Sequence, residues 1–213
     1  MRLFVAIEIE DEAKRAIVKE QQRLAQAISS SGLRWTKPDQ MHLTLVFLGE
    51  IPEQQLESIV GALKRVEDDR PTPPFDVTFG GAGLFPPRGA PRVLWLGVLE
   101  SVQTVSALQE LVARRLIEIR EAPPGSGPPA AVIKDRPFHP HVTLARWSKS
   151  HPRSMPDRRR ATEVIRASAG AGSNDVPTIA RTRVDSITLF RSTSSPPAGA
   201  GPMYTPLERV RLN

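Results

Sequence analysis

Two short stretches, His42-Leu43-Thr44-Leu45 and His141-Val142-Thr143-Leu144, repeat one pattern in a chain that contains only four histidines. Both lie in runs of residues that favour β-strands. Because side chains alternate along a strand, the histidine and threonine of each copy face one side, and the two apolar residues face the other. The copies are 99 positions apart (42 to 141), which leaves room for one α+β lobe around each.

The patterns around the two copies predict eight strands and three helices in the order β-α-β-β-α-β-β-α-β-β-β. The predicted strands are 3–7, 33–36, 41–48, 75–79, 92–98, 138–147, 183–191 and 203–212. The predicted helices are 11–29, 52–66 and 102–120, with a short further helix at 162–167. Glycine and proline predict a loop at 80–91 and a flexible connection at 122–131.

This order mixes helices and strands without strict alternation, which is typical of the α+β class. We expect two mainly antiparallel sheets with helices on their outer faces and a central cleft between two lobes. Residues 1–213 are expected to form a single domain, since this length can bury one substantial core.

Composition narrows the possible functions. The formal net charge of +6 and the pI of about 10.3 favour polyanionic partners such as nucleic acid. The absence of cysteine excludes disulfides, thiolate catalysis and cysteine-ligated metals. Residues 1–10 do not resemble a signal peptide, and no stretch approaches the ~20 apolar residues of a membrane span. We therefore expect a cytoplasmic protein without a membrane partner. We also expect a monomer.

A pair of histidines suits the hydrolysis of a phosphodiester, in which one proton is removed from water and another is delivered to the leaving oxygen. Histidine titrates near pH 6.5 and can do either. The hydroxyls of Thr44 and Thr143 can donate hydrogen bonds to the phosphoryl oxygens. A histidine metal site is the alternative, but neither motif contains an acidic residue that would complete a ligand set.

The sequence resembles the two-histidine (2H) phosphoesterase superfamily, and within it the LigT-like RNA 2',3'-cyclic phosphodiesterases. The similar segments follow in the expected order over nearly the whole chain. They are MRLFVAIEI (1–9), GLRWTKPDQMHLTLVFLGEIPE (32–53), PRVLWLGV (91–98), PFHPHVTLAR (137–146), ITLFRS (187–192) and GPMYTPLERVRL (201–212).

The resemblance implies a bilobal fold with pseudo-two-fold symmetry and one motif per lobe. It also implies that RNA with a terminal 2',3'-cyclic phosphate is hydrolysed to a 2'-phosphomonoester, with no metal and no cofactor. By resemblance, His42 is the proton donor and His141 the proton acceptor. Thr44, Thr143 and Arg146 would bind the substrate.

Strict alternation places Arg146 on the face opposite His141, so it reaches the phosphate only if the strand twists or ends. Other residues are secondary candidates. Trp35 and Phe47 are candidates for base stacking, and Arg88 and Arg92 for contacts with the RNA backbone.

His139 has two possible interpretations. It could contact and position the catalytic residues, or it could bind a metal. It could also be an ordinary residue at the start of the strand.

Other functions remain open on the same motifs. Some relatives act on ADP-ribose cyclic phosphate or other small cyclic phosphates, and the family is also associated with 2'-5' RNA ligation, which the same acid–base pair serves. A non-catalytic RNA-binding module is a further alternative, because a fold does not fix a function. The padded, arginine-rich segment 148–177 leaves the size of the substrate undecided.

Overall fold

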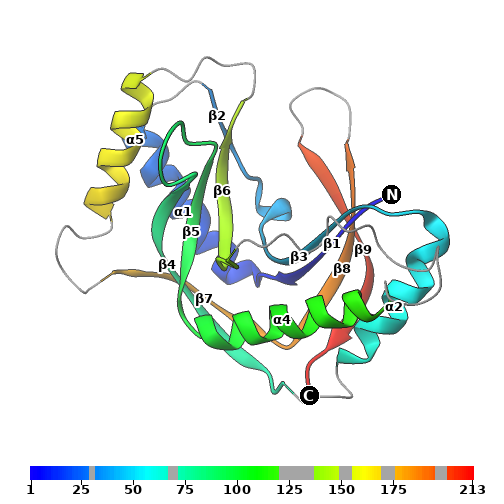
Figure 1. Ribbon diagram of the computed structural model, residues 1–213. Coiled ribbons are helices and arrows are strands. Elements are labelled where there is room, and N and C mark those ends of the chain that lie inside the picture. Colours follow the sequence, from blue (N-terminus) through cyan, green and yellow to red (C-terminus); the bar gives the residue numbers. More distant parts are fainter. Residues whose placement is uncertain (29–31, 67–71, 120–136, 149–154, 169–175, 195–200) are drawn as a thin grey trace.

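The computed structural model (Figure 1) describes residues 1–28, 32–66, 72–119, 137–148, 155–168, 176–194 and 201–213. Its strands are β1 (Arg2–Glu8), β2 (Leu33–Trp35), β3 (His42–Glu50), β4 (Phe75–Phe85), β5 (Val93–Glu100), β6 (His141–Trp147), β7 (Thr178–Val184), β8 (Ser186–Ser194) and β9 (Pro202–Arg211). Its α-helices are α1 (Asp11–Ile28), α2 (Leu56–Lys64), α4 (Val102–Glu118) and α5 (Met155–Ser168). Two short 3-10 helices are η1 (Pro38–Gln40) and η2 (Glu53–Gln55).

These strands form one antiparallel sheet in the order β7-β4-β5-β6-β3-β1-β8-β9, with β2 paired to the side of β6. The α+β class and the antiparallel pairing are therefore confirmed. The expectation of two sheets needs correction, because the two halves meet at the pair Leu43↔Val142 between β3 and β6. The join has a physical reason. It covers the inner edge of each half, which would otherwise expose unpaired backbone groups.

The half formed by β3, β1, β8 and β9 contains a bulge in the first motif strand. Thr44 pairs with Ala6 and Val46 with Val5, so Leu45 is an extra residue on β3. An extra residue of this kind shifts the alternation of side chains beyond it by one position.

The half formed by β6, β5, β4 and β7 repeats this bulge at the corresponding place. Thr143 pairs with Trp95 and Ala145 with Leu94, so Leu144 is the extra residue on β6. The two halves thus share strand order, register and bulge about the β3–β6 join. This repetition is the pseudo-two-fold symmetry that the family resemblance implies.

The helices cover the face of the sheet opposite the motif histidines. Helices α1 and α5 contact β7 and β4, while α2 and α4 contact β9 and β3. Each of α1 and α4 follows a strand of one half and packs on the other half, which ties the halves together. Leu43 and Val142, both fully buried, belong to one hydrophobic core that extends from Leu3 to Leu212.

Two strands differ from the prediction. Strand β4 continues to Phe85 through the glycines predicted as loop, and β7 was not predicted. The glycines are required by close packing rather than by a turn. A Cβ at Gly80 would lie 2.5 Å from the carbonyl oxygen of Pro177, and one at Gly83 would lie 2.1 Å from the Trp95 ring.

The predicted connection at 122–131 lies outside the described residues. In the described part of the chain, no helix is both long and apolar enough to cross a membrane.

Candidate active site

The two motifs face each other across the β3–β6 join. Since Leu43 pairs with Val142, the same antiparallel register one residue further sets His42 against Thr143 and Thr44 against His141. All four side chains are half-buried. We call the side of the sheet that carries them the motif face. The halves rise on either side of this join, with β4 to β6 in one and β8 and β9 in the other (Figure 1).

His42 is held by a backbone carbonyl and by aromatic rings. Its Nδ1 lies 2.8 Å from the carbonyl oxygen of Gln40. The ring centroid lies 4.8 Å from that of Phe4 and 5.1 Å from that of Tyr204, which meets it edge-on. Because a carbonyl only accepts, Nδ1 carries the proton and Nε2 is left for a reacting group.

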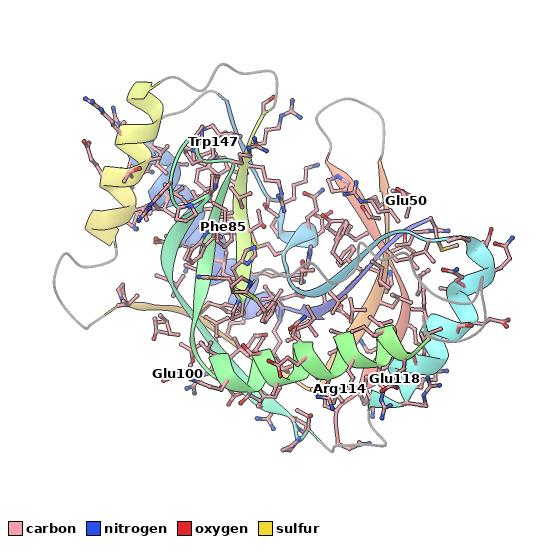
Figure 2. The ribbon with its side chains drawn as sticks, in the orientation of Figure 1. Glu50, Phe85, Glu100, Arg114, Glu118 and Trp147 are labelled. Carbon is pink, nitrogen blue, oxygen red and sulfur yellow. The ribbon has the colours of Figure 1, made fainter. Side chains whose placement is uncertain are left out.

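His141 is held in the same way. Its Nδ1 lies 2.6 Å from the carbonyl oxygen of His139, two residues earlier, as Gln40 is two residues before His42. Phe85 stands edge-on at 5.1 Å between ring centroids, and Trp95 lies at 6.2 Å. Figure 2 places Phe85 beside β6, on the half opposite Glu50.

Electrostatics link the two histidines. Burial lowers the pKa of His42 to about 4, against the opposing effect of its bond to Gln40, and the positive charges of Arg146 and His141 lower it further. Burial also lowers the pKa of His141, assisted by the charges of His139 and Arg146. Each histidine is thus neutral near pH 7 in the free protein, and Arg146 acts on both.

An acidic residue also lies across from His42 in the sheet register, on β1: Glu8. Its carboxylate accepts hydrogen bonds from Thr188 Oγ1 at 2.6 Å and from Arg209 Nη2 at 2.5 Å. Because Arg209 balances this charge, Glu8 does not cancel the effect of Arg146 on His42.

The position of Arg146 follows from the bulge. The extra residue Leu144 and its neighbour Ala145 are both fully buried, so Arg146 returns to the motif face. Its Nη2 donates to Thr143 Oγ1 at 3.3 Å. Strict alternation along β6 placed Arg146 on the face opposite His141. That placement is wrong because it assumed a regular strand without a bulge.

The secondary candidates lie in different surroundings. Trp35 packs against the hydrophobic core, whereas Phe47 is exposed. Arg88 and Arg92 are exposed at the loop between β4 and β5.

The ring centroid of His139 lies 4.5 Å from that of Trp95 and 6.3 Å from that of His141, which favours the interpretation of His139 as a residue that supports His141. The carbonyls of Gln40 and His139 were missed by sequence reasoning. Their only sequence signal is their shared place two residues before each motif histidine.

Among the residues that the structure describes, no group of three or more His, Asp or Glu side chains is arranged to hold a metal ion. The two motif strands bring two imidazoles, two hydroxyls and one guanidinium to the motif face. This set can bind an anion and can both accept and donate protons.

Comparison with known proteins identifies the family. The model described as LigT like Phosphoesterase matches residues 7–95. A Thermotoga maritima protein named RNA 2',3'-cyclic phosphodiesterase is 32% identical over 206 residues, which are 96% of this chain and 91% of that protein. The chain belongs to the LigT-like phosphoesterase family. A protein of the same name from Methanothermobacter thermautotrophicus is 28% identical over 212 residues, covering 100% of this chain and 99% of that protein.

Solved structures share the fold. A crystal structure of a Thermus thermophilus protein has a TM-score of 0.71 at 30% identity, covering 100% of this chain and 98% of that one. Escherichia coli LigT complexed with 3'-AMP has a TM-score of 0.67 at 25% identity, covering 99% and 97%. The expectation of the LigT-like fold is thereby confirmed.

Proposed function

We propose that this phosphoesterase hydrolyses the 2',3'-cyclic phosphate at the end of an RNA to a 2'-phosphomonoester, without a metal ion. The names of its relatives support the substrate. The observation that carries the mechanism is the register of β3 and β6, which sets His42 and His141 on one face with Arg146 bound to Thr143.

In the proposed reaction, His141 Nε2 removes a proton from water as the water oxygen attacks phosphorus. The bond between phosphorus and the 3'-oxygen breaks, and His42 delivers a proton to that oxygen. The phosphate stays on the 2'-oxygen. Thr44, Thr143 and Arg146 donate hydrogen bonds to the non-bridging oxygens, where negative charge increases.

His42 must gain a proton to act as the acid, although its pKa in the free protein is about 4. The negative charge of the bound phosphodiester offsets burial and the charge of Arg146, since an opposite charge nearby favours the protonated imidazole. Substrate binding therefore raises the pKa of His42, so that its imidazole is protonated before it delivers a proton to the 3'-oxygen. The lowered pKa of His141 already suits a base.

We further predict a single domain over residues 1–213, a monomeric state, a cytoplasmic location and the absence of a cofactor. Activity on small cyclic phosphates or in 2'-5' ligation would use the same pair, so only a comparison of substrates separates them. A binding module without activity would show no turnover.

Turnover of a short RNA ending in a 2',3'-cyclic phosphate tests the proposal. We expect multiple turnover in the presence of excess EDTA, with a 2'-phosphate as the product, identified by its 31P spectrum. A 3'-phosphate product would contradict the assigned leaving oxygen. Loss of turnover in EDTA that added metal restores would contradict the metal-free mechanism.

A further inference from the structure

Helix α1 carries a buried amide in the stripe of side chains that faces the sheet. The stripe recurs at helical spacing and is formed by Ala13, Ile17, Glu20, Gln21, Leu24 and Ile28. The carboxylate of Glu20 is bound by Arg23 at 2.6 and 2.7 Å. Gln21 is 6% exposed and lies between the fully buried Ile17 and Leu24. Because a buried polar group without a hydrogen bond costs stability, an amide at this position requires partners across the interface.

The partners of Gln21 are two backbone carbonyls. Its Nε2 donates to the carbonyl oxygen of Leu144 at 2.8 Å and to that of Thr36 at 3.0 Å. The backbone N–H of Thr36 donates to the same Leu144 oxygen, also at 2.8 Å. A carbonyl oxygen has two lone pairs and can accept both bonds. The amide thus joins helix α1, the end of β2 and strand β6.

Leu144 is the extra residue of the β6 bulge and has no partner residue on β5. A bulge interrupts the hydrogen-bond ladder, so the backbone at that point loses part of its restraint. The bonds from Gln21 and Thr36 act on this same residue. Gln21 therefore holds the backbone where the pairing of β6 with β5 does not.

Arg146 depends on the backbone of this bulge for its direction. Its guanidinium reaches the motif face because the bulge shifts the alternation of side chains. The residue is exposed, and its bond to Thr143 Oγ1 is long at 3.3 Å. Since neither packing nor this bond fixes the side chain firmly, a small movement of the backbone at Leu144 would move the guanidinium away from the phosphate.

Helix α4 provides a comparison, because it contacts β3, the strand with the other bulge. The buried side chains of α4 are all apolar, namely Val105, Leu108, Leu111, Val112, Ala113 and Leu116. The residue after that bulge is Phe47, whose ring stacks on Phe4 with 6.4 Å between the centroids. Of these two helices, α1 alone has a buried amide, and its amide binds the bulge that precedes the guanidinium.

We propose that Gln21 is a positioning residue, which holds the β6 bulge through the carbonyl of Leu144 and thereby directs Arg146 at the phosphate. This inference rests on the proposed function, in which Arg146 binds the phosphoryl oxygens. Gln21 lies on the helix-covered face of the sheet, opposite the motif face, so it does not contact the substrate. Its effect on the reaction therefore passes through Arg146.

The test replaces Gln21 by methionine, which keeps the length of the side chain but removes both N–H donors. We expect kcat/KM on a cyclic-phosphate RNA end to fall about tenfold, because a displacement of the guanidinium by about 1 Å weakens its bonds to the phosphoryl oxygens. Gln22→Met is the matched control. Gln22 is exposed on the same helix, so this variant should keep the wild-type value.

The pH profile separates positioning from a loss of stability. His139 and Arg146 are the charged groups that lower the pKa of His141. A displaced guanidinium lowers this pKa less, so the acidic limb of kcat/KM should move upward in pH, in the direction expected for Arg146→Ala. Partial unfolding alone would lower kcat/KM and leave the limb in place.

A double variant gives a second readout. In the Arg146→Ala protein, Gln21→Met should lower kcat/KM by less than about twofold, because effects that pass through one residue are not additive. An equal fall in both backgrounds, an unmoved limb, or a wild-type rate for Gln21→Met would overturn the proposal. Gln21→Asn is neutral and too short to reach both carbonyls, and it provides the same readouts if Gln21→Met does not fold.

A failure of the proposed function is distinguishable, because the wild-type protein would then not turn over the RNA. Binding of inorganic phosphate, measured by calorimetry, tests Gln21 without turnover. We expect Gln21→Met to bind phosphate about fivefold more weakly than the wild type, since a charge-assisted hydrogen bond from Arg146 is lost or lengthened. Equal affinities would contradict the positioning role.

Discussion

Replacing either motif histidine by alanine is expected to lower kcat on a cyclic-phosphate RNA end by about a hundredfold to ten-thousandfold. His141→Ala removes the base that activates water, and His42→Ala removes the acid that protonates the 3'-oxygen. Steady-state or single-turnover assays of each variant measure the loss. Because both proton transfers belong to one step, the double variant should be little slower than the slower single variant.

Circular dichroism and thermal unfolding serve as the folding control for these variants. Both histidines are half-buried on the motif face, so replacing their side chains by alanine should leave the hydrophobic core intact. A folded His42→Ala or His141→Ala protein with the wild-type rate would remove that histidine from the mechanism.

Arg146→Ala is expected to lower kcat/KM by about a hundredfold, because one charged donor to the phosphoryl oxygens is lost. The variant should also shift the pH profile. The charge of Arg146 lowers the pKa of both His42 and His141, so its removal raises both values. His141 then stays protonated to a higher pH, and the acidic limb of kcat/KM moves upward in pH.

Arg146→Lys is the matched control for this prediction. Lysine keeps the positive charge but loses the planar fork that binds two oxygens together. The rate should therefore fall while the acidic limb stays near its wild-type position. If the limb of Arg146→Ala also stays in place, Arg146 does not control the charge of the histidines.

The sequence predicted the motif strands well because their signal is local. Alternation within His42 to Leu45 is enough to divide the imidazole and hydroxyl from the apolar residues. It could not predict which face Arg146 takes. That depends on the extra residue Leu144, which exists only relative to the pairing of β6 with β5, far away in the sequence.

Long-range pairing also explains the other differences. The join of two expected sheets into one depends on Leu43 meeting Val142, and no local pattern encodes that contact. The glycines Gly80 and Gly83 were predicted to lie in a loop, but they belong to strand β4. They are glycines because Pro177 and Trp95 approach the backbone too closely for a side chain. Glycine marks both turns and close packing, and only the neighbours decide between them.

We propose that one phosphate lies between His42 and His141. The most direct measurement is a titration with inorganic phosphate, followed by the 15N shifts of the imidazoles, with chloride at equal ionic strength as the control. The Nε2 signals of both histidines should respond with one shared dissociation constant, and the pKa of His42 should rise from about 4. A response at only one histidine, or two separate dissociation constants, would contradict a shared phosphate site.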